Sequence, residues 1–310
     1  MSFLAILAQI IRIAVPYLFA ASGGVVAERA GVVSLTLEGF MLTGAFTAAL
    51  GSYYSGSPWI GLLCGAAGGL LFGMLHAIAS VRYKADQIVV GVAINLLAVG
   101  ITRFFLRFAF DSSSNSPRVP GFGGTAAVSA VAGGATQTAA AGGGGLSPLA
   151  SLANPLILLG LLAVPVVAFL VYRTAFGLRV RAAGEKPEAA VSLGVPVGRV
   201  RYAAVALSGV LAGLGGTYLA LDQHQFTDQM TAGRGFIALA AVIFGRWDPL
   251  RAGAACFLFA AAETLQIQLQ GSRVPSQFVE MIPYALTIVA LAGVVGRAVP
   301  PAALGKTEAA

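Results

Sequence analysis

Two long runs of the chain contain no charged residue, and this feature constrains the fold more than any other. From Gly39 through Val81, and again from Tyr202 through Leu221, the sequence has no Asp, Glu, Lys or Arg. A helix of about 20 apolar residues spans the roughly 30 Å hydrocarbon core of a bilayer. Charged residues make up only 10% of the chain, whereas a soluble domain carries roughly 25%. We therefore expect lipid, rather than water, to cover most of this protein.

The apolar runs predict an all-α integral membrane protein, because a membrane-spanning β-barrel would need alternating segments of about ten residues. We expect about nine transmembrane segments, the seventh of them short. They cover residues 3–22, 32–51, 58–80, 86–108, 152–172, 202–221, 235–246, 250–270 and 278–296. A faint repeat accompanies them, because a Gly-Gly pair precedes Gly39-Phe40 and another precedes Gly235-Phe236. The two units would start from opposite sides of the membrane, which predicts an inverted internal repeat.

Most Lys and Arg residues fall in loops that would share one side of the membrane. The loop at 173–201 is the most basic, so the positive-inside rule places it in the cytoplasm. Alternation of the segments then predicts an outside N-terminus and a cytoplasmic C-terminus. Residues 109–151, which are Gly/Ala-rich, would lie outside as a flexible loop or as a docking surface for an external partner. The net charge of +7 is thereby explained by membrane orientation, and no nucleic-acid partner is expected.

The cytoplasmic loop contains a predicted short helix from Pro187 to Leu193. Proline suits the first position of a helix, and Gly194 suits the position just past its end. A helix of about 10 Å is too short to span a membrane. A rigid, polar helix on a basic loop is typical either of a surface that docks into another protein or of an ordinary amphipathic connector.

Five polar residues lie in or beside the predicted membrane segments: Glu28, Arg29, Glu38, Gln87 and Asn95. Ionisable groups in a membrane usually face the interior of the bundle or an aqueous cavity and find partners there. We expect Glu28, Arg29 and Gln87 to be structural. Glu38 either braces the fold, which is our expectation, or contacts a substrate. Asn95 either bonds across helices or lines a transport path.

No catalytic motif is present in the sequence. There is no phosphate-binding G-x-x-x-x-G-K-[ST], no H-E-x-x-H and no G-x-S-x-G. His76 and Glu263 are expected to pack or to pair between helices, and no metal site is expected. Energy for any transport must therefore come from a partner or from an ion gradient. Gradient-driven carriers commonly bury acidic or His relays, and this chain offers few.

Four segments together resemble a known family. They are ERAGVVSLTLEGFMLTGA at 28–45, ADQIVVGVAIN at 85–95, GLRVRAAGEKPEAA at 177–190 and GRGFIALA at 233–240. In this order they resemble the permeases of ribose, nucleoside and branched-chain amino-acid ABC importers, in particular the shorter permease of bacterial nucleoside importers. Ser34 stands where that family often has Asn, and the Gly/Ala-rich stretch 121–146 is longer than usual for it.

The resemblance implies one transmembrane permease domain, residues 1–310, in the bacterial inner membrane. It implies a second related permease chain, an extracytoplasmic substrate-binding protein, a small-molecule substrate and a cytoplasmic ATPase. ATP and Mg²⁺ would be bound by that ATPase, and no cofactor by this chain. Phe40, Thr43 and Asn95 would be candidates for the substrate pathway. The residues that would couple to the ATPase are Glu185, Lys186, Pro187, Glu188, Ala189, Ala190, Leu193 and Gly194.

Three alternatives to a nucleoside permease remain open from the sequence. An importer for a simple sugar of the ribose type should have a more polar pathway than a nucleoside importer. A self-sufficient secondary carrier should transport its substrate without a partner, although the polar helix in the loop argues against it. A membrane scaffold should transport nothing.

Overall fold

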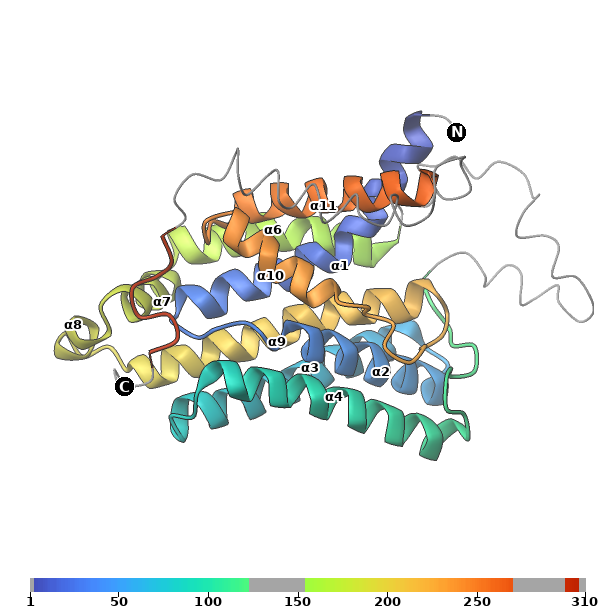
Figure 1. The fold of residues 1–310 in the computed structure, drawn as a ribbon, viewed down its shortest axis with the longest axis horizontal. Helices are drawn as coiled ribbons and strands as arrows, with labels where there is room; N and C mark the ends of the chain where they lie inside the picture. The colour runs from blue at the N-terminus through green and yellow to red at the C-terminus, as the bar shows by residue number, and fades with distance from the viewer. Residues whose placement is uncertain (1–2, 123–153, 270–298, 307–310) are drawn as a thin grey trace, which may run out of the picture.

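The computed structural model describes residues 3–122, 154–269 and 299–306 (Figure 1). Within these ranges the regular structure is helical, with one isolated β-bridge and no strand, which confirms the all-α prediction. The helices are α1 (Phe3–Arg29), α2 (Leu37–Ser55), α3 (Pro58–Ala77), the π-helical turn η1 (Ile78–Arg82), α4 (Gln87–Phe110), α6 (Pro155–Arg173), α7 (Ala175–Glu185), α8 (Pro187–Ser192), α9 (Val197–Asp222), α10 (Arg234–Phe244) and α11 (Pro249–Leu269).

Six helices of the described part are long and apolar enough to cross a membrane: α1, α3 with η1, α4, α6, α9 and α11. Helices α2 and α10 also lie at predicted segments, and α10 is short, as expected. The predicted segment at 278–296 lies outside the described residues. The multi-pass fold is therefore confirmed, whereas the full set of segments and the inverted repeat stay predictions.

The predicted start of the second segment was wrong by several residues. The segment was expected from residue 32, but α2 begins at Leu37 and α1 continues to Arg29. Gly31 adopts a positive φ of 91°, which ends the helical course of the chain. The backbone N–H of Ser34 then bonds to the Glu28 carboxylate at 3.1 Å, so the connector stays non-helical until α2 starts.

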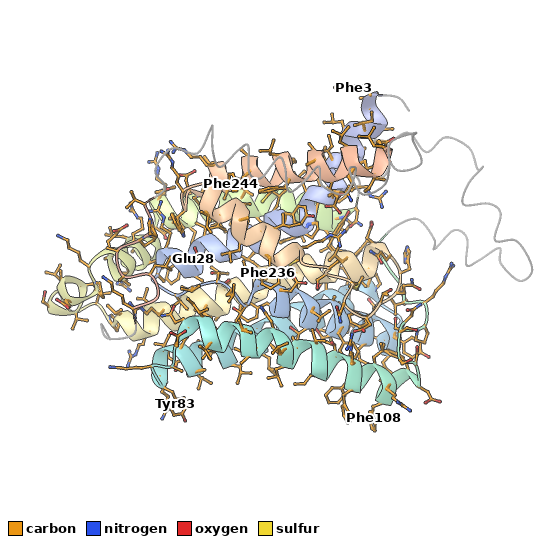
Figure 2. The ribbon with its side chains drawn as sticks, in the orientation of Figure 1. Phe3, Glu28, Tyr83, Phe108, Phe236 and Phe244 are labelled. Carbon is orange, nitrogen blue, oxygen red and sulfur yellow. The ribbon has the colours of Figure 1, made fainter. Side chains whose placement is uncertain are left out.

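Helix α9 lies at the centre of the bundle and α4 lies at its edge (Figure 1). In the apolar window of α9, 72% of the residues are buried, compared with 22% in that of α4. Phe108 on α4 points away from the bundle and is 78% exposed (Figure 2). Exposed apolar side chains on a spanning helix are expected to face lipid or another membrane chain, because lipid tails solvate them as well as a protein core does.

Glycines allow α3 and α9 to approach with their backbones nearly in contact. A Cβ atom built on Gly69 would lie 2.2 Å from the carbonyl oxygen of Gly209, and one on Gly209 would lie 2.4 Å from the carbonyl oxygen of Gly69. Small residues at such crossings let membrane helices pack by close van der Waals contact, since the hydrophobic effect contributes little between helices in lipid. This crossing fixes α9 within the bundle.

The two ends of the bundle differ in what they carry. Helices α7 and α8 project from one end, together with the C-terminal residues 299–306 (Figure 1). The start of α1 lies at the opposite end. The candidate sites described below therefore divide into a loop end and an N-terminal end.

Candidate functional site

Helices α7 and α8 form the projecting loop in which the sequence predicted a short helix. The Oγ1 of Thr174 accepts a hydrogen bond from the N–H of Gly177 at 3.1 Å and so caps α7. Pro187 occupies the first turn of α8, and Gly194 has a positive φ of 80° just beyond its end. Proline and glycine therefore occupy the places that the sequence analysis gave them. The helix at this position exists, and its coupling role stays a prediction.

The eight predicted coupling residues divide into a buried base and an exposed tip. Pro187 and Ala190 are buried against the loop. The other six are exposed: Glu185, Lys186, Glu188, Ala189, Leu193 and Gly194. Leu193 is 84% exposed and Val191 is 53% exposed. Two exposed aliphatic side chains thus lie beside charged ones on a helix whose base is buried.

The loop is fastened to the rest of the bundle through backbone contacts. Gly184 lies against α1, where an added Cβ would be 2.1 Å from the carbonyl oxygen of Arg29. The C-terminal segment 299–306 crosses the same place. The N–H of Ala303 donates to the oxygen of Gly184 at 2.8 Å, and that of Gly305 donates to the oxygen of Gly31 at 3.2 Å. The loop is therefore in direct backbone contact with the end of α1.

Glu28 and Arg29, both predicted to be structural, hold the turn between α10 and α11. The carboxylate of Glu28 is buried and accepts a hydrogen bond from the indole N–H of Trp247. The Nε of Arg29 donates to the carbonyl oxygen of Trp247 at 2.8 Å. The buried Glu28 needs such partners, because its desolvation would otherwise cost several kcal/mol, whereas Arg29 is only partly buried.

Glu38 caps the N-terminus of the short helix α10. Its carboxylate accepts hydrogen bonds from the hydroxyl of Thr231 at 2.6 Å, the N–H of Gly233 at 2.9 Å and the N–H of Gly235 at 2.7 Å. The first N–H groups of a helix have no partner within the helix, and the helix dipole favours a negative charge there. The carboxylate thus stabilises a helix that begins within the bundle, which is the geometry expected of a bracing residue.

Gln87 and Asn95 bond to the connector and the start of α2. The side-chain oxygen of Gln87 accepts from the N–H of Val33 at 2.8 Å. The Asn95 oxygen accepts from the N–H of Gly39 at 2.9 Å, and its amide donates to the oxygen of Leu35 at 2.9 Å. Both ends of the Asn95 amide are therefore used between α4 and the α2 region, as an interhelical hydrogen bond would require.

The three predicted pathway residues are all engaged with the protein. Phe40 is 1% exposed and packs edge-to-face against His76, with ring centroids 6.3 Å apart. Thr43 is buried, and its hydroxyl donates to the oxygen of Gly39 in its own helix at 2.8 Å. None of Phe40, Thr43 and Asn95 lines either of the two cavities described below. Their place in a pathway stays a prediction.

A cavity of about 580 Å³ lies between α1, α9 and α11, at the N-terminal end of the bundle. Arg12 lines it and pairs with Asp222 at 2.9 Å. Arg234 also lines it and pairs with Glu263 at 3.0 Å, while the hydroxyl of Tyr17 donates to the same carboxylate. A second cavity of about 320 Å³ has apolar walls from α1, α6 and α11. The larger cavity is thus lined by the Arg12–Asp222 pair and by Arg234, whose partner Glu263 is not among the lining residues.

Sequence reasoning did not single out this charged cavity. Glu263 was expected to pack or to pair between helices, and it pairs with Arg234 of α10. The available signals were weak: Arg12 interrupts an apolar run, and Asp222 ends one. Their partnership joins residues 210 positions apart, and no local pattern encodes such a contact.

Comparison with known proteins places these features in a family. Residues 6–291 match the family described as branched-chain amino acid transport system / permease component. The guanosine ABC transporter permease protein NupQ of Bacillus subtilis is 38% identical, with 94% of this chain and 92% of that protein covered. The nucleoside ABC transporter permease protein NupC of Lactococcus lactis is 36% identical, with 97% and 95% covered.

A third relative carries a different substrate in its name. The putative glucose ABC transporter permease protein TsgC13 of Haloferax volcanii is 36% identical, with 87% of this chain and 79% of that protein covered. No solved structure matches the chain significantly.

Proposed function

The chain belongs to the family of branched-chain amino acid transport system / permease components, and on that premise we propose that it is the permease subunit of an ATP-driven importer for nucleosides. The observation that carries the substrate class is similarity along nearly the whole chain to two permeases named for guanosine and nucleosides. This chain would form part of the passage through the membrane and would catalyse no reaction itself.

Helix α8 would be the element that receives force from a cytoplasmic ATPase. The exposed tip around Leu193 would enter the partner, and the contacts of Gly184 with Arg29 would carry its displacement into α1. ATP and Mg²⁺ would be bound by the ATPase. Under this proposal α7, α8 and residues 299–306 would lie in the cytoplasm and the start of α1 on the opposite side, as the positive-inside rule predicts.

The family resemblance supports two further partners. A second, related permease chain would complete the passage, and a substrate-binding protein would deliver the nucleoside at the end of the bundle away from α8. The exposed apolar side chains of α4, such as Phe108, are available to lipid or to the other permease.

A simple-sugar importer is the second candidate, and the similarity to a putative glucose permease favours it. The two candidates differ in one observable. A nucleoside importer should not be inhibited by glucose or ribose in large excess, whereas a sugar importer should be inhibited by one of them and should ignore nucleosides.

The proposal is tested by purifying the tagged chain from its native membrane in a mild detergent and identifying what accompanies it by mass spectrometry. We expect an ABC ATPase and a second permease. The variant Leu193→Glu should lose the ATPase, whereas Tyr83→Glu, an exposed residue in the loop after η1, should keep it. Recovery of the chain alone, together with uptake by that chain alone in liposomes, would replace the proposal with a secondary carrier.

A further inference from the structure

The larger cavity opens at the end of the bundle that lies away from α8. Its walls come from the first half of α1, from the last turn of α9 and from residues of α10 and α11. Arg12 lies about 14 Å along α1 from Phe3, at 1.5 Å per residue, and is half-exposed in the cavity. A volume of about 580 Å³ falls within the roughly 300–1,000 Å³ of pockets that hold small organic molecules.

Charged side chains in this position need an explanation. Arg12, Arg234 and Glu263 all belong to helices of a membrane bundle, and Asp222 is the last residue of α9. Ionisable residues within membrane helices are costly and generally mark pathways of substrates or ions. Because a pair that is open to the cavity keeps some of its hydrogen-bonding capacity, its donors and acceptors remain available to a ligand.

The charges of the cavity cancel. Arg12 is paired with Asp222, and Arg234 with Glu263, so neither an anion nor a cation finds an uncompensated partner. Three uncharged polar residues, Gln9, Tyr218 and Gln223, also line the cavity, and apolar residues form the rest of its wall. The apolar residues are Ala5, Ala8, Ile13, Pro16, Leu219 and Ile267. The site therefore offers an apolar surface beside clustered hydrogen-bond donors and acceptors, with no net charge.

We propose that this cavity binds the transported nucleoside, with the heteroaromatic base against the apolar wall and the ribose hydroxyls at the Arg12–Asp222 pair. The inference rests on the proposed function and locates the substrate at a site distinct from Phe40, Thr43 and Asn95. A free sugar would leave the apolar wall uncovered. A nucleotide phosphate would have to displace Asp222 from Arg12 or Glu263 from Arg234, whereas a nucleoside needs no such exchange, so the site favours the neutral nucleoside.

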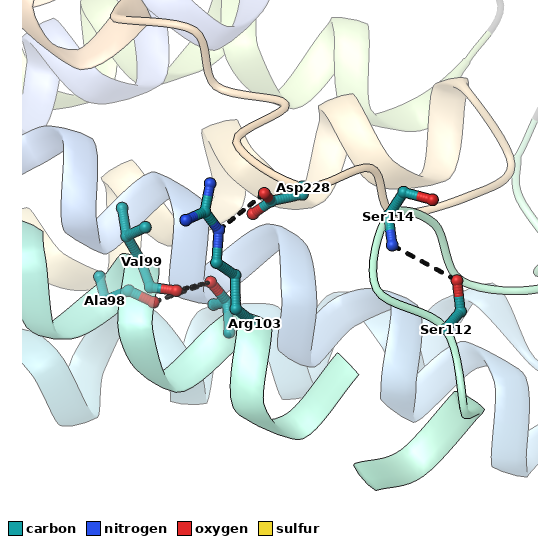
Figure 3. A network of polar contacts seen from close by, with 7 residues as sticks. Ala98, Val99, Arg103, Ser112, Ser114 and Asp228 are labelled. Atoms are coloured by element: carbon teal, nitrogen blue, oxygen red, sulfur yellow. Dashed lines mark hydrogen bonds and ion pairs between the residues drawn. The ribbon is translucent and has the colours of Figure 1, made fainter. Parts of the chain in front are cut away.

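The competing explanation is that the ion pairs only fasten helices together. The chain provides a matched control for it, because Arg103 of α4 pairs with Asp228 at 2.7 Å in the loop that follows α9 (Figure 3). That pair has similar exposure, with side chains 51% and 20% exposed, compared with 44% and 24% for Arg12 and Asp222. The Arg12 pair joins α1 to the end of α9, and the Arg103 pair joins α4 to the loop that follows α9, but Arg103 and Asp228 do not line the cavity.

The test measures binding of tritiated guanosine and of tritiated uridine to the detergent-solubilised permease assembly, without the substrate-binding protein. One of these two nucleosides should bind to the wild type. Arg12→Gln and Asp222→Asn should each weaken that binding at least tenfold, which corresponds to about 1.4 kcal/mol. Arg103→Gln and Asp228→Asn should leave it within about twofold, since exposed ion pairs contribute little. Unlabelled nucleoside should compete, whereas the corresponding nucleotide and ribose should not.

A swapped pair, Arg12→Asp with Asp222→Arg, separates the two explanations even if the single variants unfold. The swapped pair restores the ionic contact between α1 and α9, so the protein should melt near the wild-type temperature. It should nevertheless bind nucleoside more weakly than the wild type does. Wild-type affinity in the swapped protein, or equal losses in the Arg103 and Asp228 variants, would overturn the inference. Nucleoside transport without any binding to the isolated permeases would also overturn it and leave the proposed function intact. Absence of nucleoside transport by the wild-type importer would instead refute the proposed function.

Discussion

The contact between Glu38 and α10 yields the sharpest stability prediction. The carboxylate satisfies three donors from Thr231, Gly233 and Gly235, at 2.6, 2.9 and 2.7 Å. A fully buried donor left without a partner costs about 1–3 kcal/mol, and the favourable charge at the helix N-terminus adds about 0.3–1 kcal/mol. Because the three contacts are only partly buried, we take about 1–2 kcal/mol for each donor, so Glu38→Ala should lower the free energy of unfolding by about 3–7 kcal/mol.

Two milder substitutions give the expected order. Glu38→Gln keeps the shape and one oxygen acceptor but removes the charge, so we expect a loss of about 2 kcal/mol. Thr231→Val removes one donor of the three and leaves the carboxylate its two backbone partners, so the loss should be about 1 kcal/mol.

The assay is an unfolding titration with SDS in mixed micelles, combined with hydrogen exchange at Gly233 and Gly235. Exchange at these amides should rise sharply in Glu38→Ala, because the start of α10 would be exposed. An unfolding free energy within about 0.5 kcal/mol of the wild type, with unchanged exchange, would refute the capping role.

Three further predictions follow from other contacts. Gly209→Ala should destabilise the bundle by about 1–3 kcal/mol through overpacking. Gly100 faces open space, so Gly100→Ala should be neutral or stabilising in the same SDS titration. Equal midpoints for the two variants would contradict the close crossing of α3 and α9. Trp247→Phe removes the N–H that bonds to Glu28 and should cost about 1–3 kcal/mol, so an unchanged melting temperature would show that the bond contributes nothing. Ala303→Trp should displace the C-terminal segment from Gly184 and lower nucleoside uptake per ATP hydrolysed severalfold; an unchanged ratio would rule out a role for that segment in coupling.

The features that the sequence predicted well are those that depend on local pattern. The apolar runs determine the spanning helices because each run must satisfy its backbone within itself. Pro187 and Gly194 define the ends of α8 for similarly local reasons, since the conformational preferences of proline and glycine act at one residue.

Features that depend on distant contacts could not be predicted in the same way. The start of α2 was misplaced because the connector is held by Glu28 and Gln87, which lie outside it. Glu38 was expected to brace the fold, but its partner, the N-terminus of α10, lies almost 200 positions away. The pair of Arg12 and Asp222 is similarly distant and became visible only when α1 and α9 were placed side by side.

The most direct test of the account is ATP-dependent uptake of tritiated guanosine by proteoliposomes that contain this chain with its ATPase, second permease and substrate-binding protein. We predict that guanosine uptake requires ATP and that excess unlabelled nucleoside abolishes it, whereas excess glucose leaves it unchanged. The Leu193→Glu variant should insert into the membrane but should not support uptake. Two results would contradict the conclusion that this chain is the permease of an ATP-driven nucleoside importer. One is uptake in the absence of ATP or of the ATPase, and the other is uptake of glucose but not of guanosine or uridine.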